Sequence, residues 1–123
     1  MSLDHPSLLA AARDLLQRPG RATAGLWPRA SALMARQALE VALDEFWHTR
    51  APAEARDCAQ VPTHEQLLCL RRYLAEGDLA GRVAWAWSGL SRACHHHAYD
   101  MPPSSNELEA WMAVVEEFAG SQL

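Results

Sequence analysis

Apolar residues recur at every third or fourth position along most of the chain, a spacing typical of amphipathic helices. The pattern predicts five helices, over about residues 6–17, 27–49, 63–76, 79–99 and 105–119. In the longest of them, the residues predicted to face the core are Leu33, Met34, Ala38, Val41, Ala42 and Phe46. Trp47, with its leucine neighbours, widens that stripe, so this helix is expected to have neighbours on two sides.

Several helix ends carry recognisable capping residues. Thr63 with Gln66, and Ser104 with Glu107, fit the capping box, in which the side chains of the first and fourth residues satisfy backbone amides. Asp78 is predicted to cap the helix that follows it. Residues 50–62 hold two prolines and little periodicity, so we expect a loop there.

The fourth predicted helix contains two glycines, Gly81 and Gly89, close to Trp85 and Trp87. Glycine inside a helix is unfavourable by about 1 kcal/mol relative to alanine. We therefore expect close helix approach, with large rings filling the space beside the small residues. The helix is predicted to run to about Tyr99 and to be broken by the prolines that follow.

Composition agrees with an all-α fold. The chain has 123 residues, including 23 Ala but no Ile, five Val and three Thr, and β-branched residues are those that sheets favour. Ala, Leu, Glu, Gln and Arg enter helices at little cost. The sequence therefore predicts one domain over residues 1–123, an up-and-down bundle of about five helices.

Charge and cysteine content restrict which partners and which cellular location the sequence allows. A net charge of −4 argues against a protein that coats nucleic acid through a broad basic surface, although a local phosphate site is compatible with it. Three cysteines without C-x-x-C spacing indicate a reducing, cytoplasmic location. The N-terminus lacks the pattern of a signal peptide, and no stretch approaches the roughly 18 apolar residues of a membrane span, so no membrane association is expected.

The densest polar cluster lies at the end of the fourth predicted helix, where Arg92 is followed by three consecutive histidines and Tyr99. Imidazole exchanges protons near neutral pH, and the arginine fork suits phosphate oxygens. On an unbroken helix, with about 100° per residue, His97 would lie about 140° from Arg92. A site that uses both residues needs either a loosened helix end or two copies of the segment.

The spacing Arg92-x4-His97-x-Tyr99 resembles the signature of the HEPN superfamily, in particular the toxins paired with minimal nucleotidyltransferase antitoxins. The order of predicted elements is also similar to that of the family. The resemblance implies a helical homodimer with a metal-independent endoribonuclease site, in which Arg92 and His97 are catalytic and act on RNA across the dimer interface. It also implies that Tyr99 can be nucleotidylated by an antitoxin partner.

The sequence departs from that signature at Ala93, because the family usually has a polar residue directly after the arginine. Two interpretations remain open. His95 and His96 can supply the missing polar group as supporting residues, or the protein is a relative without catalytic activity.

Two other classes of function compete with this prediction. Cys94 and the histidines after it are zinc ligands by type, but consecutive helical residues point in different directions, so we predict no metal site and no cofactor. Alternatively, the chain is a non-catalytic protein-interaction module, because its five tryptophans suit an interface as well as a core.

Overall fold

The computed structural model describes residues 4–17, 27–53, 55–74, 78–95 and 101–121. Across these ranges all regular structure is helical, which confirms the all-α prediction. The helices are α1 (His5–Gln17), α2 (Trp27–Arg50), α3 (Ala55–Gln60), α4 (Thr63–Leu70), α5 (Leu79–Cys94) and α6 (Ser105–Gly120).

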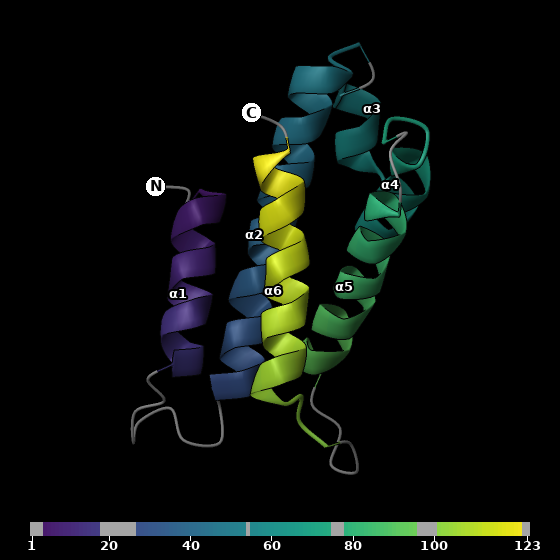
Figure 1. Cartoon of the computed structure of the whole chain (residues 1–123). Coiled ribbons are helices and arrows are strands. Elements are labelled where there is room, and N and C mark those ends of the chain that lie inside the picture. Colours follow the sequence, from purple (N-terminus) through teal and green to yellow (C-terminus); the bar gives the residue numbers. More distant parts are fainter. Residues whose placement is uncertain (1–3, 18–26, 54, 75–77, 96–100, 122–123) are drawn as a thin grey trace.

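The four long helices form the bundle, and successive ones alternate in direction (Figure 1). Helix α2 packs against α1, α5 and α6, and α6 also contacts α1 and α5. Helices α2 and α6 therefore form the central pair, with α1 on one side and α5 on the other (Figure 1). This arrangement confirms that α2 has neighbours on two sides.

The face of α2 that enters the core differs from the predicted one in its first half. Leu33 is 46% exposed, and Met34 and Val41 are only partly buried. Ala38 and Ala42 are fully buried as predicted, and Ser31, Ala32 and Ala35, which were not predicted, are fully buried too. Small side chains let the neighbouring helices approach closely. In its first half, α2 therefore turns its small residues, and not its large apolar ones, towards its neighbours.

Larger side chains fill the core near the C-terminal end of α2. Phe46 packs edge-on against Trp47, with ring centroids 5.1 Å apart, and lies 5.7 Å from Phe118 of α6. Tyr73, just after α4, makes edge contacts with both α2 rings. Edge-to-face pairs of this kind add to the gain from burial alone, so this cluster joins α2, α6 and the turn after α4.

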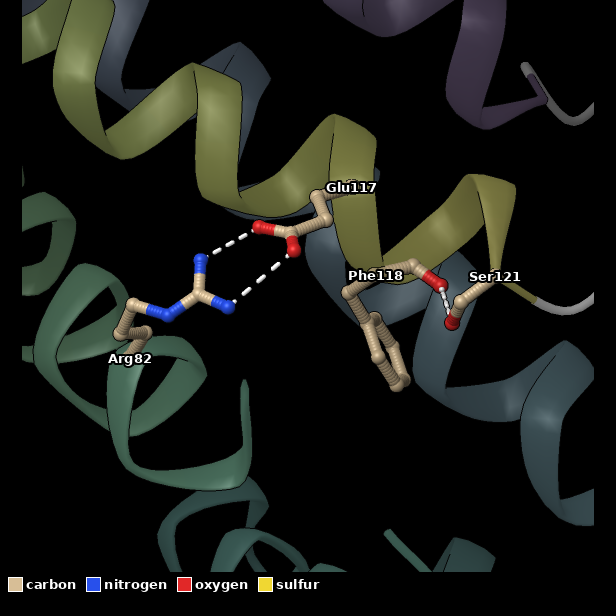
Figure 2. A network of polar contacts seen from close by, with 4 residues as sticks. All are labelled: Arg82, Glu117, Phe118 and Ser121. Atoms are coloured by element: carbon tan, nitrogen blue, oxygen red, sulfur yellow. Dashed lines mark hydrogen bonds and ion pairs between the residues drawn. The ribbon is translucent and has the colours of Figure 1, made fainter. Parts of the chain in front are cut away.

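Helices α5 and α6 are also joined at the surface. Both terminal nitrogens of Arg82 in α5 donate to the carboxylate of Glu117 in α6, one of them at 3.1 Å (Figure 2). One residue further along, Phe118 enters the core, and its carbonyl accepts a bond of 2.7 Å from the Ser121 hydroxyl. The arginine bond lowers the pKa of Glu117 and raises that of Arg82.

The predicted loop over residues 50–62 contains a short helix, α3, so that part of the prediction is wrong. Ala51 and Ala55 are both 4% exposed and belong to the core. A helix of six residues is too short to show a period of 3.6, and its burial depends on residues distant in sequence.

Helix α4 differs from the prediction at both ends. Pro62, and not Thr63, is the N-cap, and no side chain caps the helix. The Gln66 amide is engaged elsewhere, because it accepts from Trp47 Nε1 at 2.9 Å and donates to the Val61 carbonyl at 3.1 Å. The helix ends at Leu70 in a turn, several residues before the predicted end.

Of the two remaining predicted caps, one forms and the other makes no side-chain hydrogen bond. At α6, Ser104 Oγ accepts from the Glu107 amide and Glu107 Oε1 accepts from the Ser104 amide, each at 3.1 Å, which confirms that capping box. Asp78 occupies the N-cap of α5, but its side chain makes no capping bond.

Candidate functional site at the junction of α5 and α6

The candidate site is built around the end of α5. The buried face of this helix includes Val83, Gly89, Leu90 and Cys94. After Cys94 the backbone leaves the helix: His95 has φ −95° and ψ 115°, and its amide donates to the Arg92 carbonyl. The prediction that the helix continues past this point is therefore wrong at His95.

A contact from α2 helps to explain where α5 stops. Arg29 Nε donates to the Cys94 carbonyl at 2.9 Å, across 65 positions of sequence. The last carbonyls of a helix lack partners within the helix, and a basic side chain that binds one of them stabilises that end. Since α5 ends here, the divergence of about 140° calculated for an unbroken helix no longer applies to Arg92 and His97.

Arg92 lies in the last turn of α5 and is exposed. Its Nε is 3.4 Å from the Ser88 carbonyl, a long hydrogen bond within the same helix. No carboxylate in the described ranges lies within ion-pair distance of this guanidinium, whereas Arg13, Arg36 and Arg82 all have one. The Arg92 charge is therefore available to an anion from outside the chain.

A cavity of about 500 Å³ adjoins Arg92, between the last turns of α5 and the start of α6. Arg92 and Glu107 bring opposite charges to its walls. Its described lining residues are Gly89, Arg92, Ala93, Met101, Pro102, Pro103, Ser104, Glu107 and Trp111.

Gly89 sets how closely the two helices approach beside this cavity. A Cβ atom on Gly89 would lie 2.3 Å from Cε2 of Trp111, a distance that no real contact allows. This confirms the predicted close approach at Gly89, although the ring comes from α6. At Gly81 the nearest atom of the described residues would be 3.6 Å away, and Trp85 is 50% exposed, so the described residues show no close approach there.

Trp111 is only 5% exposed, yet its Nε1 has no hydrogen-bond partner among the described residues. The indole edge that carries Nε1 lies against Gly89, and both residues line the cavity. A buried N–H without an acceptor is unfavourable by about 1–3 kcal/mol. This donor is therefore an unusual feature of the contact between α5 and α6, where it is buried against Gly89.

The predicted site residues are only partly described. Arg92 and His95 are exposed, and Ala93 is partly buried beside the cavity. The predicted site residues His96, His97 and Tyr99 lie outside the described residues. Glu107 and Trp111 line the same cavity as Arg92, whereas the sequence pattern indicated only a capping role for Glu107.

The cysteines and histidines form no metal cluster within the part of the chain that the structure describes. Cys94 is buried, whereas its neighbour His95 is exposed. Burial raises the pKa of the Cys94 thiol, against an opposing effect from Arg36. Cys58, Cys69 and Cys94 are not joined to one another by disulfides.

A second cavity, of about 400 Å³, lies between α1 and α6. Its charged residues Arg13 and Glu116 form an ion pair with each other. The cavity beside Arg92 differs in offering a cation that no described residue neutralises, and it is the better candidate for a ligand.

Comparisons with protein-family models, with curated proteins and with solved structures find no match to this chain. None of the helices in the described ranges is both long and apolar enough to cross a membrane.

Proposed function

We propose that this protein is a HEPN-like, metal-independent endoribonuclease of a toxin–antitoxin or defence system. The observation that carries the proposal is the Arg92-x4-His97-x-Tyr99 pattern, whose arginine is an exposed cation without an ion-pair partner in the described residues. The position of Arg92 beside a cavity supports the proposal, because a substrate can reach the guanidinium there.

The proposed chemistry uses the RNA's own nucleophile. The 2′-hydroxyl attacks the adjacent phosphorus, and the bond to the 5′-oxygen breaks, leaving a 2′,3′-cyclic phosphate and a 5′-hydroxyl. His97 acts as general base for the 2′ proton or as general acid for the 5′-oxygen. Arg92 stabilises the negative charge that develops on the phosphoryl oxygens.

A homodimer with a composite site is part of the proposal and follows from the resemblance. Two copies of the motif would place one imidazole as base and the other as acid around a single phosphate. Because α5 ends at Cys94, a single chain is no longer prevented by helix geometry from uniting Arg92 with His97. Dimerisation is therefore tested directly, by analytical ultracentrifugation at micromolar concentration, where a monomer alone would exclude the composite site.

Ala93 leaves one position of the signature without its polar group. His95 is exposed and has left the helix, so its imidazole is not restricted to one helical face. We propose His95 and His96 as the groups that support the catalytic pair. Replacing both with alanine should lower cleavage less than His97→Ala does.

The decisive experiment measures cleavage of a mixed-sequence RNA by the purified protein in the presence of EDTA. Arg92→Ala and His97→Ala should each lower the rate by about 10²–10³, as expected for a positioned electrostatic or proton-transfer group. Arg72→Ala, which removes another exposed arginine away from the cavity, is the matched control. Full activity in both test variants, or no cleavage by the wild-type protein, would refute the proposal.

The toxin–antitoxin setting adds a partner. We propose that a nucleotidyltransferase antitoxin modifies the Tyr99 hydroxyl and thereby blocks the RNA site. Mass spectrometry after incubation with such an enzyme and a nucleoside triphosphate should show one added nucleotide per chain, and Tyr99→Phe should abolish the addition.

A non-catalytic interaction module is the second candidate, and the exposure of Trp85 favours it. This side chain is 50% exposed, although its ring meets Trp111 at 6.3 Å. Large exposed aromatic residues are common at the centres of protein interfaces. If the wild-type dimer cleaves no RNA, this function becomes the better supported one.

A further inference from the structure

We propose that the cavity between α5 and α6 binds one unpaired nucleobase of an RNA substrate, while Arg92 holds the phosphate attached to the same nucleotide. The inference rests on the proposed ribonuclease function and adds a binding subsite to it. Three features of the described residues support it: an available cation, a carboxylate and an apolar wall.

The charges come from the two helices separately. Arg92 extends from α5 and has no ion-pair partner among the described residues, and its planar fork of donors suits phosphate oxygens. Glu107 extends from the first turn of α6, where Oε1 accepts from the Ser104 amide. Its second oxygen makes no capping bond and can accept from the amino or imino group of a base.

Trp111 forms the wall of the cavity next to Gly89. Its indole Nε1 is buried against Gly89 and has no partner among the described residues, so it is not exposed to a ligand in the cavity. The edge of a nucleobase carries donors, and the carboxylate of Glu107 offers an acceptor for them.

The rest of the lining suits a flat ring. Met101 is 91% exposed and lies beside Pro102 and Pro103. A cavity of about 500 Å³ that combines apolar walls with a few polar groups is of ordinary size for a small-molecule site. A nucleotide carries the ring, the edge groups and the anion together, and inorganic phosphate would use Arg92 alone.

The test measures equilibrium binding of nucleoside 5′-monophosphates, ribose 5-phosphate and inorganic phosphate to the full-length protein by calorimetry. At least one nucleotide should bind about tenfold more tightly than ribose 5-phosphate, because only the nucleotide carries the base. Arg92→Gln should weaken the binding of all of them.

Glu107→Gln is the sharpest variant. Glutamine at this position preserves the capping box, so α6 should keep its start, but the second oxygen becomes an amide nitrogen that donates. Binding of the preferred nucleotide should fall about tenfold, while ribose 5-phosphate should bind as before. Glu109→Gln, which changes an exposed carboxylate of the same helix outside the cavity, should leave both affinities unchanged.

Two results would overturn the inference: equal binding of nucleotides and ribose 5-phosphate, or nucleotide binding that is insensitive to Glu107→Gln. Nucleotide binding measured on His97→Ala separates binding from cleavage. Nucleotide binding without any RNA cleavage by the wild-type protein would refute only the ribonuclease function. Cleavage without any dependence on the base would refute only the subsite.

Discussion

The contact between Gly89 and Trp111 predicts an unusual response to adding one methyl group. In Gly89→Ala the new Cβ would lie 2.3 Å from Cε2 and 2.4 Å from Cζ2 of the indole. The ring is rigid and only 5% exposed, so it cannot move aside without disturbing the packing of α6. Overpacking of this kind typically costs about 1–3 kcal/mol, and the higher helix propensity of alanine offsets up to about 1 kcal/mol. We expect a net loss of about 1–2 kcal/mol in the free energy of unfolding.

Urea unfolding monitored by circular dichroism measures this loss, and Gly81→Ala is the control in the same helix. Among the described residues, a Cβ at Gly81 would meet only Asp78 Oδ1, at 3.6 Å, so that variant should gain about 0.5–1 kcal/mol. Adding Trp111→Leu to Gly89→Ala should recover part of the lost stability, because a smaller side chain removes the clash. If Gly89→Ala proved as stable as Gly81→Ala, the inferred close approach would be wrong.

Three further predictions concern single contacts. Ser104→Ala removes the α6 cap and should cost about 1 kcal/mol of unfolding free energy in urea titrations, whereas Ser105→Ala should change it little. Gln66→Leu leaves Trp47 Nε1 without its acceptor and should cost about 1–3 kcal/mol, and thermal unfolding that matches the wild type would contradict this. Because Arg82 lowers the Glu117 pKa below its ordinary value of 4.5, the stability from this pair should be present above that value and be lost as the pH falls through the lowered pKa. Carboxyl NMR titration should show the Glu117 pKa return towards the ordinary value in Arg82→Gln.

The parts of the fold that sequence predicts well are those with a strong local pattern. Helix α2 runs for 24 residues, long enough for its apolar stripe to dominate, and it begins at the predicted Trp27. The start of α6 is set by a capping box whose bonds are all local. Helix α3 and the start of α4 are less predictable, because buried alanines and the Gln66–Trp47 bond join residues distant in the chain.

Local sequence likewise predicts some features of the candidate site and not others. Arg92 is recognisable from its motif, and Gly89 signals a close contact by its place inside a helix. The end of α5 depends on Arg29, 65 positions away, which no local pattern reveals. The sequence explains Glu107 fully as part of a helix cap. That Glu107 also lines a cavity becomes apparent only from the packing of α6 against α5.

Stability and recognition depend on the same contacts at this junction. The capping box fixes the first turn of α6, and the contact between Gly89 and Trp111 fixes the distance of α6 from α5. Arg92 and Glu107 therefore extend into the cavity from two helices whose separation is set by tight packing. A site held in this way loses little conformational freedom when a ligand binds, which favours affinity. Substitutions at Gly89 should consequently alter nucleotide binding as well as stability, although this residue offers a ligand no side chain.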